Sequence, residues 1–190
     1  MNEIKINNDD FYDCPNCKYL KRKSILSSKL EKERYDKHIC DDGYIKYMNK
    51  MYDSIKSYII GKDILDYGCG QIHALSDIIN ADGLSCSYYD LYYYPRLDDK
   101  LYDTIILIEV FEHILTPLEE LMKIKSMLNK NGRIIIATNL RVDKLDSWWY
   151  LRDKTHVSIF SCEAIIKLAQ ITGFNYEIIK ESNLIILSSI

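Results

Sequence analysis

The sequence predicts an α/β fold with a doubly wound, mostly parallel sheet, on the basis of three observations. From residue 44 onward, short apolar runs alternate with segments whose apolar residues recur at helical spacing. The run over 104–110 is continuous and rich in β-branched residues, which is typical of a strand that helices cover on both faces. The last two apolar runs follow one another without a helix, which predicts a closing hairpin and one antiparallel strand.

The first predicted elements lie on either side of a glycine turn. Apolar residues over 44–59 recur at helical spacing, which predicts an amphipathic helix that ends at Gly61. The short apolar run over 63–67 predicts a buried strand, and a helix is expected over 74–80. Helix, strand, turn and helix in this order begin a doubly wound sheet.

Two strands and a helix follow. The runs over 84–90 and 104–110 predict the strands. Thr116 and Pro117 are expected to begin the helix, because an acidic residue follows at capping-box spacing and proline is favoured at the first helical position. The Asn-Gly pair at 131–132 is predicted to end it.

The chain is predicted to close with a strand, a helix and a hairpin. The run over 133–138 is strand-like. A helix over 161–170 is expected to end at Gly173, because glycine readily adopts the left-handed conformation of a helix C-cap. The runs over 174–180 and 184–187 predict the terminal hairpin.

Length and charge limit the kinds of partner. A chain of 190 residues can form one globular domain with a sizeable core. Its net charge of −3 provides no basic field for nucleic acid, so we expect a small-molecule partner instead. No signal-peptide pattern and no membrane-length apolar run is present, so we expect a cytoplasmic protein without membrane contact. Nothing in the sequence predicts the oligomeric state.

The polar, lysine-rich segment over 1–43 is predicted to be an N-terminal helical arm with a lid-like segment, ahead of a domain over 44–190. A Cys-x-x-Cys pair at 14–17 supplies two of the four ligands that a structural zinc site needs. His38 and Cys40 could complete such a site, but their spacing is cramped. We therefore expect a metal-free remnant, which the family resemblance described below implies to be half a zinc ribbon.

Two acidic residues and two glycines indicate a ligand site at the carboxyl edge of the predicted sheet. Asp66 ends one strand and Asp90 ends the next, while Gly68 and Gly70 follow Asp66 at once. Glycine lets a backbone approach a ligand closely, and an acid about 20 residues further on can accept hydrogen bonds from a ribose. We therefore expect a nucleoside. Nicotinamide dinucleotide is disfavoured, because its fingerprint requires glycine where this chain has His73.

A positively charged nucleoside without phosphate suits this acidic turn better. S-adenosylmethionine has that character, with an ammonium and a sulfonium group for the turn and a ribose for Asp90. Four segments together resemble class I S-adenosylmethionine-dependent methyltransferases, which have a Rossmann-like fold. These are ILDYGCG, Asp90, YDTIILIEVFEHI and LNKNGRIIIATNL. More narrowly, EKERYDKHICDDGYIKYM and WWYLRDKTHVSIFS resemble a largely uncharacterised bacterial subgroup.

The resemblance implies methyl transfer from S-adenosylmethionine to a small-molecule acceptor, as O-, N- or C-methylation. The arginine of the N-terminal segment would favour an anionic acceptor. We expect the cofactor to be bound by Asp66, Tyr67, Gly68, Cys69, Gly70, Asp90, Leu91 and Glu109. We expect proton transfer by His113, His156 and His38, and acceptor contacts from Arg34, Tyr35, Trp149 and Tyr150.

Two departures from the family pattern leave an alternative open. Ile72 stands where the family often has a small residue, and the interval from Asp90 to Tyr102 has room for only a shortened third strand. A catalytically silent protein that binds S-adenosylmethionine, or a regulator, is therefore the alternative. The histidines could be structural, and Trp149 and Tyr150 could pack in the core rather than form a lid.

Overall fold

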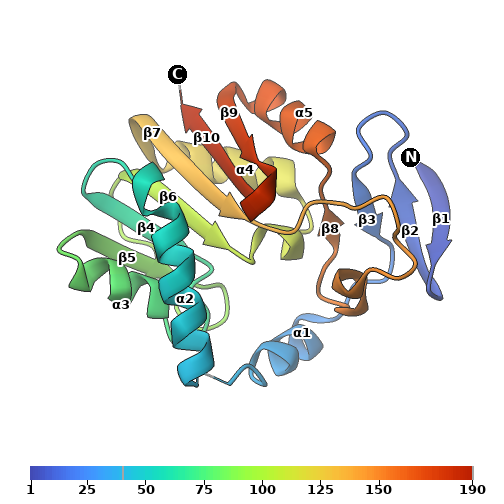
Figure 1. Ribbon diagram of the computed structural model, residues 1–190, viewed down its shortest axis with the longest axis horizontal. Coiled ribbons are helices and arrows are strands. Elements are labelled where there is room, and N and C mark those ends of the chain that lie inside the picture. Colours follow the sequence, from blue (N-terminus) through green and yellow to red (C-terminus); the bar gives the residue numbers. More distant parts are fainter. Residues whose placement is uncertain (40, 190) are drawn as a thin grey trace.

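The computed structural model describes residues 1–39 and 41–189. These residues contain two sheets, with helices packed around the larger one. The larger sheet has six strands in the order β5-β4-β6-β7-β10-β9, and the smaller has four in the order β1-β2-β3-β8. Figure 1 shows the larger sheet on the left and the smaller one on the right, with β8 and the long connection after β7 between them.

The larger sheet confirms the predicted α/β fold. Its first four strands in the chain are parallel, and β10 lies antiparallel between β7 and β9. The chain passes from β4 to β5 and then returns to the other side of β4, so the strand order reverses at this point, where ligands of such sheets bind. The strands are β4 (Asp63–Tyr67), β5 (Ser85–Tyr89), β6 (Tyr102–Ile108), β7 (Leu128–Ala137), β9 (Phe174–Ile179) and β10 (Leu184–Ser189).

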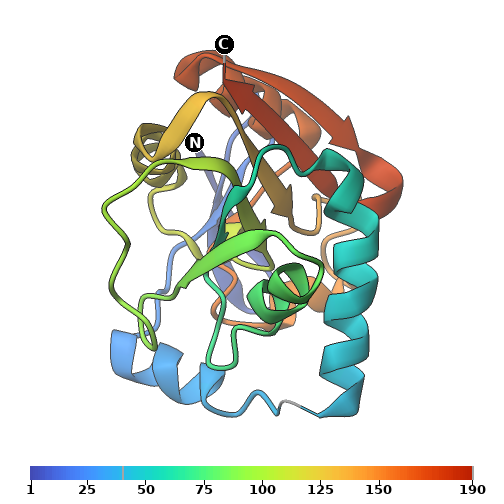
Figure 2. The ribbon, with the colours of Figure 1, turned by 90° about the vertical axis from the view of Figure 1, so that its left-hand side faces the viewer.

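Helices cover both faces of the larger sheet, as Figures 1 and 2 show. Successive strand residues point to opposite faces. Ile64 and Ile106 pack with the apolar residues of α2 and α3, whereas Leu65 and Ile105 pack with those of α4 and α5. Burial on both faces explains why β6 is continuously apolar in sequence. The helices are α2 (Asp42–Ile55), α3 (Ala74–Ala81), α4 (Pro117–Ser126) and α5 (Cys162–Thr172).

The third-strand region is shortened, as the sequence predicted. Residues 90–101 connect β5 to β6 with no strand of their own. An isolated bridge joins Asp90 and Tyr94, whose backbone N–H and C=O groups exchange hydrogen bonds of 3.0 and 3.1 Å. The connection therefore turns back on itself at the carboxyl end of the sheet.

The N-terminal segment contains strands where the sequence predicted a polar helical arm. Three antiparallel strands precede α1, and β3 pairs with β8, so this segment shares a sheet with residues that immediately precede α5. The strands were missed because they are short and keep many of their residues exposed or half-buried, which weakens the apolar alternation. The elements are β1 (Asn2–Ile6), β2 (Asp9–Asp13), β3 (Leu20–Arg22), α1 (Ser28–Tyr35) and β8 (Ser158–Ile159).

Two predicted boundaries were wrong. α2 ends at Ile55 and a short 3-10 turn, η1 (Lys56–Tyr58), follows, so the helix stops before Gly61. β7 begins at Leu128, one residue after the C-cap of α4. The Asn-Gly pair at 131–132 therefore lies inside a strand instead of ending a helix.

The helix caps were predicted in part. Thr116 precedes α4 without a side-chain capping bond, although proline occupies the first helical position. Ser161 caps α5 by accepting the N–H of Ala164, and Gly173 ends it with a φ of 69° in the left-handed region. None of the helices in the described ranges has the length and apolar character that crossing a membrane requires.

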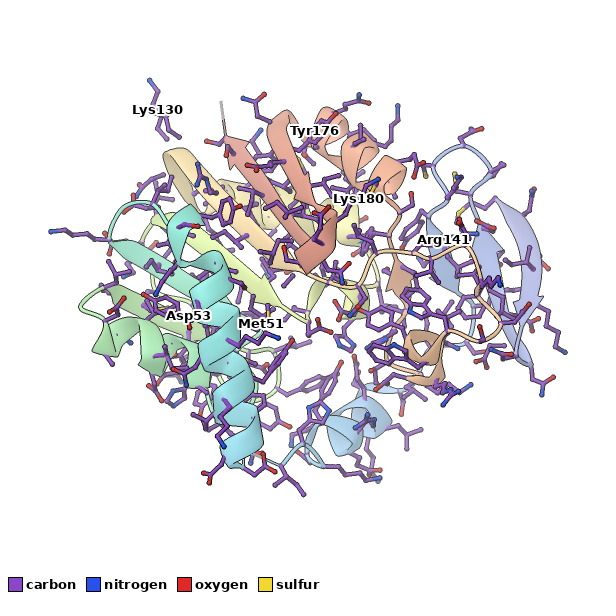
Figure 3. The ribbon with its side chains drawn as sticks, viewed as in Figure 1. Met51, Asp53, Lys130, Arg141, Tyr176 and Lys180 are labelled. Atoms are coloured by element: carbon purple, nitrogen blue, oxygen red, sulfur yellow. The ribbon has the colours of Figure 1, made fainter. Side chains whose placement is uncertain are left out.

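Two arginines tie the smaller sheet to the rest of the molecule. Arg22 is buried, donates to the backbone oxygen of His156 at 3.1 Å and pairs with Asp9 at 2.6 Å. Arg141, labelled in Figure 3 on the connection between the sheets, binds both carboxylate oxygens of Asp13 at 2.6 and 3.0 Å. Guanidinium groups that are paired in this way fix the relative position of the segments they join.

Candidate functional site

The glycine turn after β4 leaves the backbone open at the edge of the sheet. Gly68 and Gly70 have φ values of 87° and 69°, which glycine adopts without strain. A Cβ on Gly68 would lie 2.5 Å from the Val110 side chain, whereas one on Gly70 would meet nothing within 4 Å. The N–H groups of Gly68 and Cys69 both donate to Tyr89 O, which fixes the turn against the end of β5.

Asp66 places a buried carboxyl group directly beneath this turn. Its Oδ2 atom has no hydrogen-bond partner among the described residues. Burial raises the pKa of Asp66 to about 7, the N–H of Ser76 opposes the rise, and the charges of Asp90 and Asp77 add to it. A buried polar atom without a partner is unfavourable, so a ligand with a positively charged donor would stabilise this group.

Asp90 links the glycine turn to the connection after β5. Its carboxylate accepts the N–H of Gly70 at 3.1 Å and those of Tyr92 and Tyr93 at 2.8 and 3.1 Å. An ionised carboxylate accepts up to about four hydrogen bonds, so capacity remains for a ligand hydroxyl. Asp90 thus positions the site in addition to its predicted ribose contact.

A single cavity of about 1500 Å³ opens at the carboxyl ends of β4, β5 and β6. Its size exceeds the usual 300–1,000 Å³ of a small-ligand site, so it can hold two small molecules side by side. Every residue predicted to bind the cofactor lines it: Asp66, Tyr67, Gly68, Cys69, Gly70, Asp90, Leu91 and Glu109.

The structure brings three histidines from distant parts of the chain to the same cavity. His113 lies on the 3-10 turn η2 (Phe111–His113) after β6, and its ring centroid is 4.9 Å from that of His156. Tyr35 lies between His113 and His38, with centroid distances of 5.5 and 6.1 Å. Their convergence was predicted, and their chemical roles stay predictions.

Burial favours the neutral form of two of these histidines. Burial lowers the pKa of His156 and also that of His38. The Nδ1 atom of His113 lies 3.0 Å from Thr155 O, and that of His156 lies 2.7 Å from Tyr150 O. Since a carbonyl oxygen only accepts, Nδ1 carries a hydrogen in both rings, and Nε2 is the atom that has the lone pair when the ring is neutral.

The two aromatic residues predicted to contact the acceptor differ in position. Both begin the 3-10 turn η3 (Trp149–Arg152), but Trp149 is exposed and lines the cavity, whereas Tyr150 is 1% exposed and lies outside the lining. The Tyr150 ring packs 4.0 Å from His156, and its hydroxyl is 3.1 Å from Thr138 Oγ1. The prediction of direct acceptor contact by Tyr150 is therefore corrected to packing behind His156.

Residues of helix α1 line the cavity, and the helix lies below the larger sheet in Figures 1 and 2. None of its residues is buried. The Tyr92 hydroxyl donates to Glu31 at 2.6 Å, and the Tyr93 hydroxyl donates to Asp36 at 2.7 Å. Polar contacts thus hold the helix over the connection after β5.

Arg34 of α1 lines the cavity but is already paired. Its guanidinium binds Asp153 at 2.8 Å. Burial raises the pKa of Asp153, but hydrogen bonds from Thr155 and the charges of His156 and Arg34 outweigh it and lower the value to about 2. An anionic acceptor would therefore compete with an ionised carboxylate for Arg34.

Two acidic residues follow β6, and sequence reasoning assigned a role to only one of them. Glu109 has a φ of 52°, and burial, the charge of Glu112 and a hydrogen bond with Glu112 raise its pKa. Glu112 is fully buried, its Oε2 accepts the Thr138 hydroxyl at 2.8 Å, and its Oε1 has no partner among the described residues. Its position three residues after Glu109 was the sequence signal that could have identified Glu112.

The cysteine pair does not meet its proposed partners in the described ranges. Cys14 and Cys17 are free and lie between β2 and β3. His38 lines the cavity beside Tyr35, and Cys40 lies outside the described residues. The expectation that this cysteine pair binds no metal stays a prediction.

Comparison with known proteins identifies the family. A family profile described as "Methyltransferase domain" matches residues 41–178. The chain belongs to this family. A comparison with curated proteins gives no match.

Solved structures of methyltransferases share the fold of this methyltransferase domain. A SAM-dependent methyltransferase from Archaeoglobus fulgidus is 14% identical, with a TM-score of 0.62 over 86% of this chain and 100% of that chain. The magnesium protoporphyrin IX methyltransferase of Synechocystis, with bound SAM, is 15% identical, with a TM-score of 0.53 over 86% and 92%. The plantazolicin methyltransferase, in complex with a desmethyl analogue and SAH, is 14% identical, with a TM-score of 0.53 over 85% and 90%.

The residues present fit S-adenosylmethionine, the methyl donor that the family supports. The unpartnered oxygen of Asp66 suits an ammonium group, and Gly70 leaves its backbone open. Asp90 keeps capacity for a ribose hydroxyl. Ile72 lines the same cavity, so its branched side chain contributes to the wall of this pocket.

Proposed function

We propose that this protein transfers the methyl group of S-adenosylmethionine to a small-molecule acceptor bound under α1. The observation that carries the proposal is the shared cavity, which joins the acidic glycine turn to the three histidines. A cavity covered by one polar helix suits a small acceptor better than a macromolecule. The cytoplasm remains the proposed compartment, on the sequence alone.

The residues of the chain would act by binding and orientation. When bound, S-adenosylmethionine supplies an electrophilic methyl group on its sulfonium. Asp66 would bind the ammonium group, Asp90 the ribose, and the turn at Gly70 would bring the backbone close to the ligand. Rigid placement of two reactants contributes much of the rate of such displacements, because the acceptor atom must be in line with the bond that breaks.

The acceptor side would exclude water and remove a proton. Trp149, Tyr35 and α1 line the outer part of the cavity, and a dry pocket favours the meeting of an electron-rich acceptor with a sulfonium. His38, His113 and His156 are the candidate proton acceptors, and neutral imidazoles are suited to that role. Lys37 and Arg152 also line the cavity, and neither forms an ion pair with a described residue, which supports an anionic acceptor.

Calorimetry with S-adenosylmethionine and S-adenosylhomocysteine tests the cofactor half of the proposal. We expect both to bind the wild-type protein and Asp90→Asn to weaken binding at least tenfold, roughly the loss of one hydrogen bond to a charged group. Asp98→Asn is the matched control, because Asp98 lies on the same connection, bonds Ser87 and does not line the cavity.

Two results would count against this assignment. One is the absence of binding by either nucleoside to folded wild-type protein. The other is equal weakening by Asp90→Asn and Asp98→Asn, which would indicate a general disturbance of the connection. Binding of both nucleosides without any methylated product would instead favour a catalytically silent or regulatory protein.

A further inference from the structure

Three side chains beside the cavity form a group whose chemistry methyl transfer alone does not require. Glu112, His113 and His156 each offer one potential ligand atom, and these atoms lie within 4.8 Å of one another. Within residues 1–39 and 41–189 this is the one group of at least three such side chains with that geometry. The two rings come from segments more than 40 residues apart, which the fold places together.

Both histidines are oriented as metal ligands are. Each Nδ1–H is held by a backbone carbonyl, of Thr155 for His113 and of Tyr150 for His156. Metal-bound histidines usually donate their second ring nitrogen in this way, which fixes the tautomer and the ring orientation. The remaining Nε2 atoms keep lone pairs for a cation.

Glu112 provides an independent indication of a missing partner. The residue is fully buried, and Oε1 has no hydrogen-bond partner among the described residues although Oε2 accepts the Thr138 hydroxyl. A buried carboxylate oxygen without a donor is strongly disfavoured. A proton shared with the neighbouring carboxyl of Glu109 or a cation would stabilise it, and only a cation would also use the lone pairs of the two neighbouring imidazoles.

Buried packing supports the group from behind. Arg22 donates to the backbone oxygens of Leu151 and His156, at 2.7 and 3.1 Å. The Tyr150 ring packs against His156 at 4.0 Å. Glu109, Asp153 and His38 also interact with these side chains, as do the tyrosines Tyr35, Tyr47 and Tyr150. The group is thus held in one arrangement before any ligand binds.

We propose that Glu112, His113 and His156 bind a divalent transition-metal ion at the acceptor end of the cavity. Two imidazoles and one carboxylate suit ions such as Mn²⁺, Fe²⁺ or Co²⁺ and leave coordination positions open. His113 and His156 line the cavity, so an acceptor with an oxygen donor atom is the class that this site favours. This last step rests on the proposed function, whereas binding of the ion does not.

The proposal changes the roles that the sequence predicted for two histidines. As ligands, His113 and His156 would have no free ring nitrogen, because Nδ1 is bonded to a carbonyl and Nε2 to the ion. His38 would then be the remaining candidate for the proton acceptor on this cavity.

Titration of the full chain with Co²⁺ tests the site through the visible absorption of the bound ion. The protein is first treated with a chelator and desalted. We expect one Co²⁺ per chain, and Glu112→Gln and His113→Asn should each weaken binding at least about tenfold, since changes even to supporting residues have effects of that size. Glu112→Gln keeps the shape and an acceptor for Thr138, and His113 is only half-buried, so both variants should fold.

Two matched controls separate this site from others. His38→Asn removes a histidine of the same cavity that lies outside the group and should leave Co²⁺ affinity unchanged. Cys14→Ser removes a thiol of the Cys-x-x-Cys pair and should have no effect, whereas loss of binding there would place the ion at the cysteines and overturn the proposal. No binding below about 1 mM by folded wild-type protein, or unchanged binding in both ligand variants, would also overturn it.

Calorimetry with S-adenosylmethionine in the presence of chelator keeps the two proposals separate. Co²⁺ binding without nucleoside binding would support the metal site and reject the methyltransferase assignment. Nucleoside binding without Co²⁺ binding would support the methyltransferase assignment and reject the metal site.

Discussion

Asp66 is a carboxyl group whose ionisation burial opposes, and this makes stability depend on pH. Its pKa rises from 3.8 to about 7 in the folded protein, so the folded state holds a proton that the unfolded state has lost. Stability should therefore fall as pH rises from about 4 to about 7 and then level off. Asp66→Asn keeps an acceptor for Ser76 and removes the titration. The melting temperature of the variant minus that of wild type should therefore be larger at pH 8 than at pH 5.

The matched control for this prediction is Asp63→Asn. Asp63 begins the same strand, is partly exposed and pairs with Lys100. Its profile of melting temperature against pH should keep the wild-type shape. Parallel profiles of wild type and Asp66→Asn between pH 5 and 8 would show that Asp66 does not hold a proton in the folded state.

Residues in short-range patterns were predictable from the sequence, and residues that depend on distant partners were not. Gly68, Gly70 and Asp90 follow from their spacing to one strand and the next. Tyr150 was misplaced because its burial depends on His156 and on the smaller sheet. Glu112 lacked a role because its partner Thr138 follows another strand, β7, which ends at Ala137.

At the scale of elements, α1 is a helix without buried residues, held by polar contacts and by ring contacts of Tyr35 with Tyr92 and His113. Eight residues are too few for a stable isolated helix, and none of these is buried, so α1 depends on Tyr92, Tyr93 and Asp153 for its place over the cavity. The double variant Tyr92→Phe, Tyr93→Phe should raise amide hydrogen exchange over 30–35 by at least about tenfold, because each lost bond to a carboxylate contributes about 1.5 kcal/mol or more.

Tyr94→Phe is the control for this prediction about α1. Its hydroxyl donates to Gln71 O, away from α1, although it lies on the same connection. Exchange over 30–35 should be unchanged in this variant. Equal exchange rates in wild type and the double variant would mean that other contacts hold α1 in place.

The predictions of strands and helices were right where apolar periodicity is strong and wrong where a strand depends on pairing with a distant part of the chain. β4 and the closing hairpin were predictable because their apolar runs are bounded by turn residues. β1 to β3 were not, because β3 gains its burial by pairing with β8, some 140 residues later in the chain. β8 has only two residues, which are too few to show the apolar alternation of a strand in the sequence.

For the whole molecule, the cavity exists because the two sheets are joined. The larger sheet provides the glycine turn and His113, while the smaller sheet holds the segment that carries Asp153 and His156 through Arg22. The family profile covers residues 41–178, so the N-terminal strands and α1 lie outside it. The fold of the methyltransferase domain was therefore predictable from motifs, whereas the closure of its cavity required the structure.

Methyl transfer itself is the central claim, and one assay tests it most directly. Wild-type protein is incubated with S-adenosylmethionine carrying a deuterated methyl group, a pool of small metabolites and Mn²⁺, and products are read by mass spectrometry. We expect a labelled product and an equal amount of S-adenosylhomocysteine, with His156→Ala reducing both by at least about 100-fold. Folded protein that binds the nucleoside but forms neither labelled product nor S-adenosylhomocysteine above background would contradict the claim.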